Sequence, residues 1–265
     1  MECLHKGAPV VKKSIALLAQ FVLAVCLSAS LADAQTPDGE NKDAGKIRVL
    51  LTYGGHGFKQ EPFFKMFDDM KGITYTKAAL PESADMLKPG LEKKFDVIVM
   101  YDMVRGFTPE QQKALVALLN EGIGLVSLHH NIGAHRDWPE FTNIIGGKFL
   151  FKPRTIDGKE MPRSGYAHGQ DMDITIAEKE HPITKGLKDF SIHDETYNKF
   201  HVTDDVKMLM TTDHPKNDPP IAWVKKYGES PVFYFMLGHD AKAWANESFP
   251  EVVERGIKWT CGKLK

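Results

Sequence analysis

Histidines gather at the ends of predicted strands in this sequence. His56 follows the apolar run "KIRVLLTYGG", His129 and His130 follow "GLVSL", and His239 follows "FYFMLG". Imidazole exchanges protons near neutral pH and is the commonest side-chain ligand of metal ions. Burying several histidines without a function would cost desolvation at each one. Three strand ends that each carry histidine therefore indicate a chemical site.

The adjacent pair poses a geometric question. Successive side chains of a strand point to opposite faces, so His129 and His130 can enter one site only where the strand has already turned. We expect His129 to point into the site and His130 to flank the pocket after the turn. The sequence leaves open whether the chain turns after the first or the second histidine.

Further polar residues come from two segments that we expect to be loops. The segments 164–171 and 191–200 contribute His168, Asp194, Glu195 and Tyr197. A glutamate near histidines supports two chemistries, namely general acid–base catalysis and a His/carboxylate metal site. The sequence contains neither H-E-x-x-H nor C-x-x-C, so it leaves both chemistries open.

The elements that must position these residues alternate along the first half of the chain. Apolar runs at 46–54, 73–80, 95–102 and 122–129 predict strands, and segments at 61–71, 109–122 and 138–147 predict helices. The second half predicts strands at 171–177, 206–213, 220–228 and 230–240, then a helix at 250–261. This order is typical of an α/β domain with a mostly parallel sheet covered by helices on both faces. Ligands of such sheets bind at the carboxyl ends of the strands, where the histidines lie.

The charge pattern excludes several classes of partner. The 265 residues include 34 Lys and Arg and 35 Asp and Glu, which gives a formal net charge of −1, and the basic residues are scattered. Binding to nucleic acid or to an anionic membrane surface would call for a basic patch. We therefore expect a small-molecule partner rather than nucleic acid or a membrane.

The beginning of the chain has the form of a secretory signal peptide. A cationic stretch precedes an uncharged apolar run at 14–31, and Ala32 and Ala34 form an A-x-A cleavage site. We expect cleavage after Ala34 and a secreted or periplasmic protein. The alternative is an uncleaved N-terminal membrane anchor, since the apolar run is about long enough to approach a span.

Cleavage would divide the chain into a signal peptide at 1–34, a flexible leader at 35–45 and an α/β domain at 46–262. The mature chain would keep Cys261 as its one cysteine, so we expect no intramolecular disulfide. We interpret Cys261 as a bystander, because no base lies near it in sequence to form the reactive thiolate.

Seven short motifs resemble, in the same order, those of the ThuA-like, trehalose-utilisation family. They are "GGH" after the first strand, "LVSLHH", "WPEF…GGKF", "HPITKGL", "DETY", "PPIAWVKKYG" and "FYFMLGHD". Together they run from about residue 47 to 260. The resemblance implies a flavodoxin-like three-layer α/β sandwich of the class I glutamine amidotransferase type. The matching functional positions are Gly55, His56, His129, His130, Asp194, Glu195, Tyr197, Gly238 and His239.

Amidotransferases of this fold carry a nucleophilic cysteine at the turn where this chain has His129 or His130, so we expect no glutaminase activity. The resemblance instead implies carbohydrate metabolism, with trehalose, another disaccharide or a 3-keto-glycoside as substrate. Two positions depart from the family pattern. Gly57 stands where relatives often have an acidic residue, and Asn131 stands where a small residue is usual, which puts any functional role at these positions in doubt.

Together these observations predict a sugar-processing hydrolase, lyase or isomerase. We assign His129, Glu195 and His239 as acid–base residues or metal ligands. Substrate binding is assigned to Gly55, His56, His130, His168, Asp194 and Tyr197. A divalent metal is the one cofactor that the site suggests. The alternative function is a non-catalytic carbohydrate-binding module, with aromatic platforms at Trp138, Tyr166, Tyr197 and Trp244.

Overall fold

The computed structural model describes residues 45–156 and 158–265, which belong to one compact unit. The predicted signal peptide lies outside these residues, as does the predicted leader apart from its last residue, so both stay predictions. In the described ranges, no helix is long and apolar enough to cross a membrane.

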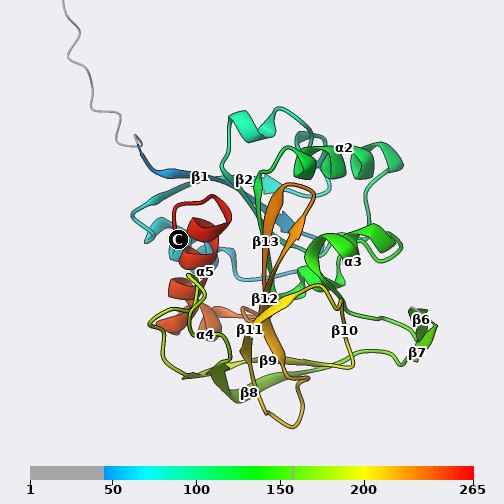
Figure 1. Cartoon of the computed structure of the whole chain (residues 1–265), viewed down its shortest axis with the longest axis vertical. Coiled ribbons are helices and arrows are strands. Elements are labelled where there is room, and N and C mark those ends of the chain that lie inside the picture. Colours follow the sequence, from blue (N-terminus) through cyan, green and yellow to red (C-terminus); the bar gives the residue numbers. More distant parts are fainter. Residues whose placement is uncertain (1–44, 157) are drawn as a thin grey trace, which may run out of the picture. The chain divides into compact units, whose positions relative to one another are not determined.

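A nine-stranded sheet forms the centre of the unit (Figure 1). Five neighbouring strands are parallel: β2 (Ile73–Ala79), β1 (Ile47–Gly54), β3 (Val97–Asp102), β4 (Gly124–Leu128) and β13 (Ser230–Phe235). Four antiparallel strands extend the sheet beyond β13: β12 (Pro220–Tyr227), β11 (Lys207–Thr211), β8 (Gly165–Ile176) and β9 (Phe190–Asn198). The structure confirms the predicted α/β class with a large, mostly parallel central sheet.

Helices cover both faces of this sheet. They are α1 (Gln60–Asp68), α2 (Pro109–Asn120), α3 (Pro139–Ile145), α4 (Ala241–Trp244) and α5 (Ser248–Thr260). In Figure 1, α4 and α5 lie to the left of the sheet, and α2 and α3 lie to its right. As predicted, Thr108 caps α2, and its hydroxyl accepts a hydrogen bond from the Gln111 amide while Pro109 fills the first turn.

Short elements complete the unit. The 3₁₀ turns are η1 (Ala84–Met86), η2 (Leu91–Lys93) and η3 (His129–Gly133), and the two-stranded pairs are β5 (Gly147–Lys148) with β10 (His201–Val202) and β6 (Arg154–Ile156) with β7 (Lys159–Met161). Of these, η3 and β5 matter most for function. η3 directly follows β4, β5 comes after α3, and both carry the chain past the ends of the parallel strands.

The two segments predicted to be loops are strands instead. Residues 164–171 fall mostly in β8, and residues 191–200 fall mostly in β9, which pairs antiparallel with β8. Buried and exposed residues alternate only in the second half of β8, and its first half contains exposed and half-buried residues but no buried one. This polarity hid the strand in the sequence, where acidic and glycine-containing segments are typical of loops.

Candidate functional site

The parallel strand β4 ends in a sharp turn at His129. Its φ of 47° lies in the left-handed region, which few non-glycine residues adopt. Two contacts hold the turn: the Tyr234 hydroxyl donates to the His129 carbonyl at 2.9 Å, and His129 Nδ1 donates to the Met236 carbonyl at 2.7 Å. The chain therefore turns at the first histidine itself, which allows both imidazoles to lie at the site.

Three donor atoms meet beyond this turn. His129 Nε2 lies 3.2 Å from Glu195 Oε2 and 3.2 Å from His239 Nδ1, and His239 Nδ1 lies 3.4 Å from the same Glu195 oxygen. The three atoms thus form a nearly equilateral triangle. They come from the start of η3 directly after β4, from β9 and from the turn after β13, so both halves of the sheet contribute to the triangle.

Two further groups contact the triangle. The Tyr197 hydroxyl lies 3.0 Å from His129 Nε2, and the His168 Nδ1 atom lies 3.0 Å from the second carboxylate oxygen of Glu195. Glu195 and Tyr197 lie two residues apart on β9, so both side chains point to the same face of the strand.

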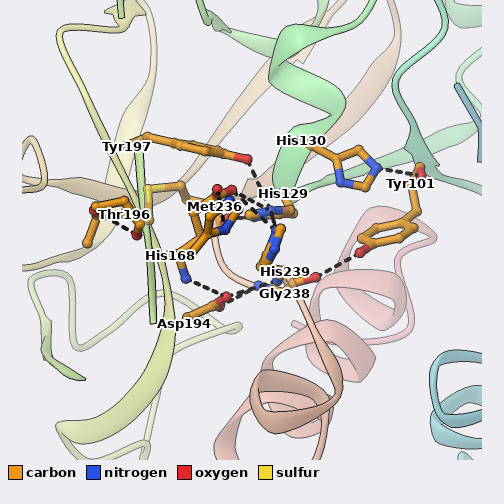
Figure 2. A network of polar contacts seen from close by, with 12 residues as sticks. Tyr101, His129, His130, His168, Asp194, Thr196, Tyr197, Met236, Gly238 and His239 are labelled. Carbon is orange, nitrogen blue, oxygen red and sulfur yellow. Dashed lines mark hydrogen bonds and ion pairs between the residues drawn. The ribbon is translucent and has the colours of Figure 1, made fainter. Parts of the chain in front are cut away.

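Asp194 positions His239 from behind. One of its carboxylate oxygens accepts a hydrogen bond from the Gly238 amide at 2.6 Å, and the other accepts from the amides of His239 and Glu195 (Figure 2). Its side chain is buried. Asp194 therefore fixes the backbone that carries two of the three donor atoms, and its predicted role in binding substrate stays a prediction.

A cavity of about 210 Å³ opens beside the triangle. Its polar lining is His56, His130, His168, Glu195 and Tyr197, and its other lining residues are Met103, Ile132, Gly133, Phe149, Phe151 and Tyr166. His129 is fully buried and is not among the lining residues, whereas His130 is. That His129 points into the site while His130 flanks the pocket stays a prediction.

Gly55 contributes through its backbone. Its φ is +71°, and a Cβ at this position would lie 2.5 Å from the Met103 backbone. Gly55 therefore turns the chain so that His56 reaches the cavity, and its predicted contact with substrate stays a prediction.

The His130 ring has a defined tautomer. Its Nε2 lies 3.0 Å from the Tyr101 carbonyl, which can only accept, so Nε2 carries the proton in the neutral form. The Nδ1 atom is buried and has no hydrogen-bond partner in the described residues, and the same is true of His56 Nδ1. The two rings lie 4.6 Å apart, and they leave two polar atoms unsatisfied next to the cavity.

Burial and mutual proximity set the charges of this group. Burial, with neighbouring His129, lowers the pKa of both His130 and His56. Burial opposes ionisation of Glu195, but hydrogen bonds from His129 and His239 outweigh it and hold the Glu195 pKa well below its usual range. The hydrogen bond to Glu195 in turn raises the pKa of His239.

The aromatic residues proposed as sugar platforms have different environments. Trp138 and Trp244 are buried in the core, whereas Tyr166 is 55% exposed and lines the cavity with Tyr197. The Trp244 indole donates to the Gly238 carbonyl at 2.8 Å, so it supports the turn before His239.

Asn131 and Cys261 also have structural settings. The Asn131 amide donates to the Asp102 carbonyl and its oxygen accepts from Ser127, so the departure from the family pattern braces the turn after β4.

Cys261 follows Thr260, whose backbone lies against Gly124 at the beginning of β4. Since His129 follows the end of that strand, Cys261 lies toward the opposite edge of the sheet.

Several residues around the site were not found from the sequence. Tyr101 holds His130 through its carbonyl and Gly238 through its hydroxyl (Figure 2), and Tyr234 holds the His129 turn. Both are interior residues of strands, where aromatic side chains usually serve packing. Their only sequence signal is that each lies next to the last residue of its strand, and only the strand of Tyr234 is followed by a histidine of the site.

Comparison with known proteins gives this arrangement a family. The sequence matches the family described as "ThuA: Trehalose utilisation" over residues 48–260. The chain belongs to the ThuA family. The comparison with curated proteins gives no significant match.

Solved structures agree with this assignment at the level of the fold. A putative ThuA-like protein from Parabacteroides merdae is 18% identical with a TM-score of 0.68, covering 83% of this chain and 92% of its own. A putative ThuA-like protein from Bacteroides uniformis is also 18% identical, with a TM-score of 0.62, covering 83% and 93%. A putative GMP synthase component from Thermoplasma acidophilum is 8% identical with a TM-score of 0.50, covering 82% and 94%. The structure thus has the predicted glutamine amidotransferase-like fold, with His129 at its strand-end turn.

Proposed function

We propose that this ThuA-family protein is an exported enzyme that acts on a sugar or 3-keto-glycoside, using a divalent metal ion held by His129, Glu195 and His239. The observation that carries the proposal is the triangle of donor atoms. Ligands at about 2.0–2.1 Å in tetrahedral geometry lie about 3.3 Å from one another. The three observed separations are 3.2, 3.2 and 3.4 Å.

Hydrogen bonding alone accounts poorly for the same atoms. Charge-assisted N–H···O bonds are usually about 2.7–2.9 Å long, shorter than either imidazole–Glu195 separation. His129 Nδ1 donates to a carbonyl, so neutral His129 presents one lone pair at Nε2. Three groups approach that single atom, from Glu195, Tyr197 and His239. A metal ion would join these ligands, and the carbonyl contact is the outer-shell partner that metal-bound histidines usually have.

The surroundings of the triangle suit a polyhydroxylated substrate. The cavity combines imidazoles, a carboxylate and a phenol with aromatic and aliphatic walls, which is the usual composition of a small-molecule site. The Nδ1 atoms of His56 and His130 have no hydrogen-bond partner in the described residues, and both rings line the cavity. A metal ion here would polarise a carbonyl oxygen and ease proton removal from the neighbouring carbon.

Family membership supports the carbohydrate part of the proposal, and the apolar N-terminal run supports export. Glutaminase activity is not part of it. The strand-end turn carries His129, and the one cysteine in residues 45–156 and 158–265 lies toward the other edge of the sheet.

Elemental analysis of protein purified without a histidine tag or chelator tests the proposal. We expect about one equivalent of a divalent metal, lost in His129→Ala and in Glu195→Gln. His214→Ala is the matched control, because His214 lies in a turn remote from the triangle in sequence and should leave the metal content unchanged.

Metal-free protein that also takes up no zinc or manganese on reconstitution would rule out the metal. Binding of sugar by such a protein, unaffected by loss of single histidines but weakened by Tyr166→Ala, would favour the carbohydrate-binding alternative. Tyr166 is the most exposed of the four aromatic residues considered for that role.

A further inference from the structure

A second cavity, of about 280 Å³, adjoins the histidine cavity and is walled mainly by cations. Its charged lining residues are Arg105, Arg136, Asp137, Lys148, Lys152 and Arg154. Phe149 and Phe151 line both cavities. The stretches after β3 and after η3, and the segment from β5 to β6, bring these residues together, so the basic cavity lies at the same edge of the sheet as the histidines.

Lys148 is buried without an acidic partner. It is 5% exposed, and its ammonium donates to the carbonyls of Ala134 and His135 at 3.0 and 2.8 Å. No carboxylate pairs with it in the described part of the chain, and an ammonium has three protons to donate. Buried charges are normally paired, so this environment lacks a negative group.

Lys225 shows how the same protein satisfies another buried lysine. Its exposed fraction is 8%, similar to that of Lys148, and its ammonium lies 2.8 Å from an Asp205 carboxylate oxygen. The contrast makes the unpaired Lys148 a specific feature of the basic cavity rather than a general property of lysines in this fold.

The arginines of the basic cavity are also incompletely satisfied. The Arg136 guanidinium lies 3.7 Å above the Phe151 ring, and its Nε is buried with no hydrogen-bond partner in the described residues. Arg154 pairs with Asp137 at 3.1 Å, but that carboxylate is 89% exposed and its attraction is weakened by water. Burial and nearby Arg154, opposed by Asp137, lower the pKa of Lys148 to about 8.

We propose that the basic cavity binds an oxyanion, such as a phosphate or carboxylate group, with Lys148, Arg136 and Arg154 as its donors. The oxyanion would supply the negative charge that Lys148 lacks and an acceptor for the buried Arg136 Nε. Because Phe149 and Phe151 line both cavities, an oxyanion carried by a sugar would hold the sugar ring beside the histidines. This last step alone rests on the proposed function.

Calorimetric titration of the purified protein with sulfate at low ionic strength tests the site. We expect saturable binding that Lys148→Met weakens by about tenfold or more, since it removes a buried charged donor. Lys225→Met is the matched control and should bind sulfate like the parent protein. Arg154→Gln, at a half-buried position, gives a second test that does not depend on a core substitution. Absence of sulfate binding, or equal weakening by both lysine variants, would overturn the proposal.

The source of the oxyanion is distinguished by comparing inorganic phosphate, glucose 6-phosphate, glucuronate and glucose. Tighter binding of the two anionic sugars than of phosphate and glucose would identify a substrate subsite. Equal binding of phosphate and glucose 6-phosphate would identify a site for the free anion. Glu195→Gln should bind sulfate like the parent protein but lose the metal ion. A failure of the metal proposal would appear in the metal content, whereas a failure of the oxyanion proposal would appear in sulfate binding.

The site should also respond to pH. Sulfate keeps its charge over the range used. The charged groups that face Lys148 in the basic cavity are Arg105, Arg136, Arg154, Asp137 and Lys152. Lys148, with its pKa of about 8, is the group that loses its proton. We expect sulfate affinity to fall by about tenfold from pH 7 to pH 9, because binding then requires proton uptake. In Lys148→Met the affinity should change little over the same range, and an equally steep fall there would contradict the assignment.

Discussion

At the scale of single residues, the site depends on histidines whose hydrogen bonds to the backbone leave one ring nitrogen free. His129 is held at both its carbonyl and its Nδ1, so only Nε2 remains for chemistry. His130 is held at Nε2, which leaves Nδ1. A backbone carbonyl fixes the tautomer in both cases, and this determines which nitrogen can bind a ligand.

Asp194 offers a test of positioning at this scale. In Asp194→Asn one amide N–H must face a backbone N–H, because the carboxylate accepts hydrogen bonds at both oxygens. We expect metal affinity to fall by about 10–100-fold, as for other outer-shell changes, with the metal still bound at saturation. Competition with a chelating dye measures it.

Asp240→Asn provides the control for that measurement. Asp240 lies in the same turn, but its side chain caps α4 by accepting from the amide of Lys242, and asparagine caps helices equally well. Its metal affinity should match that of the parent protein. If Asp194→Asn also matched the parent, the backbone around His239 would not need this carboxylate.

At the scale of elements, the turns after the parallel strands determine where the functional groups lie. Gly55 after β1, His129 after β4 and Gly238 after β13 all have positive φ. The histidines at these turns could be predicted, because apolar runs followed by glycine or histidine indicate strand ends in the sequence. The tight approach of Gly55 to Met103 could not, since it joins residues from different strand ends.

The Gly55 turn gives a prediction about stability. Gly55→Ala places a Cβ against the Met103 backbone at a left-handed φ, so we expect a loss of about 2–4 kcal/mol in the free energy of unfolding. Urea denaturation measures it. Gly57→Ala is the control, because a Cβ there has open space, and it should stay within about 0.5 kcal/mol of the parent. Equal values for both variants would contradict the close contact.

The antiparallel strands show where sequence patterns fail. Glu195 and His168 were identified as site residues, yet their segments were expected to be loops and are β9 and β8. β9 buries the polar residues Asp194, Glu195 and Thr196, and the first half of β8 has no buried residue. Neither segment therefore shows the apolar alternation that would reveal a strand. The cations of the basic cavity are separated by up to about fifty positions in sequence, and nothing local indicates that they meet.

At the scale of the whole molecule, the fold carries buried titratable groups outside the site. His135 is fully buried among Phe107, Trp138 and Phe141, and neither ring nitrogen has a hydrogen-bond partner in the described residues. Burial, with the nearby Lys148 charge, lowers its pKa to about 3. The folded protein therefore keeps His135 neutral where the unfolded chain would protonate it.

This linkage predicts acid sensitivity. The folded pKa lies below the unfolded value of about 6.5, so the stabilisation is complete above that pH and is lost as the pH falls toward 3. Between pH 7 and pH 5 we expect His135 to account for a loss of about 2 kcal/mol in the free energy of unfolding. Asparagine tolerates the positive φ of position 135. In His135→Asn the loss in the free energy of unfolding between pH 7 and pH 5 should therefore be about 2 kcal/mol smaller than in the parent protein. Parallel pH dependences of the two proteins in urea denaturation would argue against a neutral buried His135.

The position of β13 has a consequence for the order of events during synthesis. This strand is made after β12 but inserts between β12 and β4, so it joins the parallel strands to the antiparallel ones. Until residues 230–235 have left the ribosome, the two halves of the sheet have no shared neighbour. Glu195 and His129 stay on separate parts of the nascent chain until then, and His239 follows β13 directly. The three donor atoms, which we propose as metal ligands, can therefore meet only after the chain has been made as far as His239.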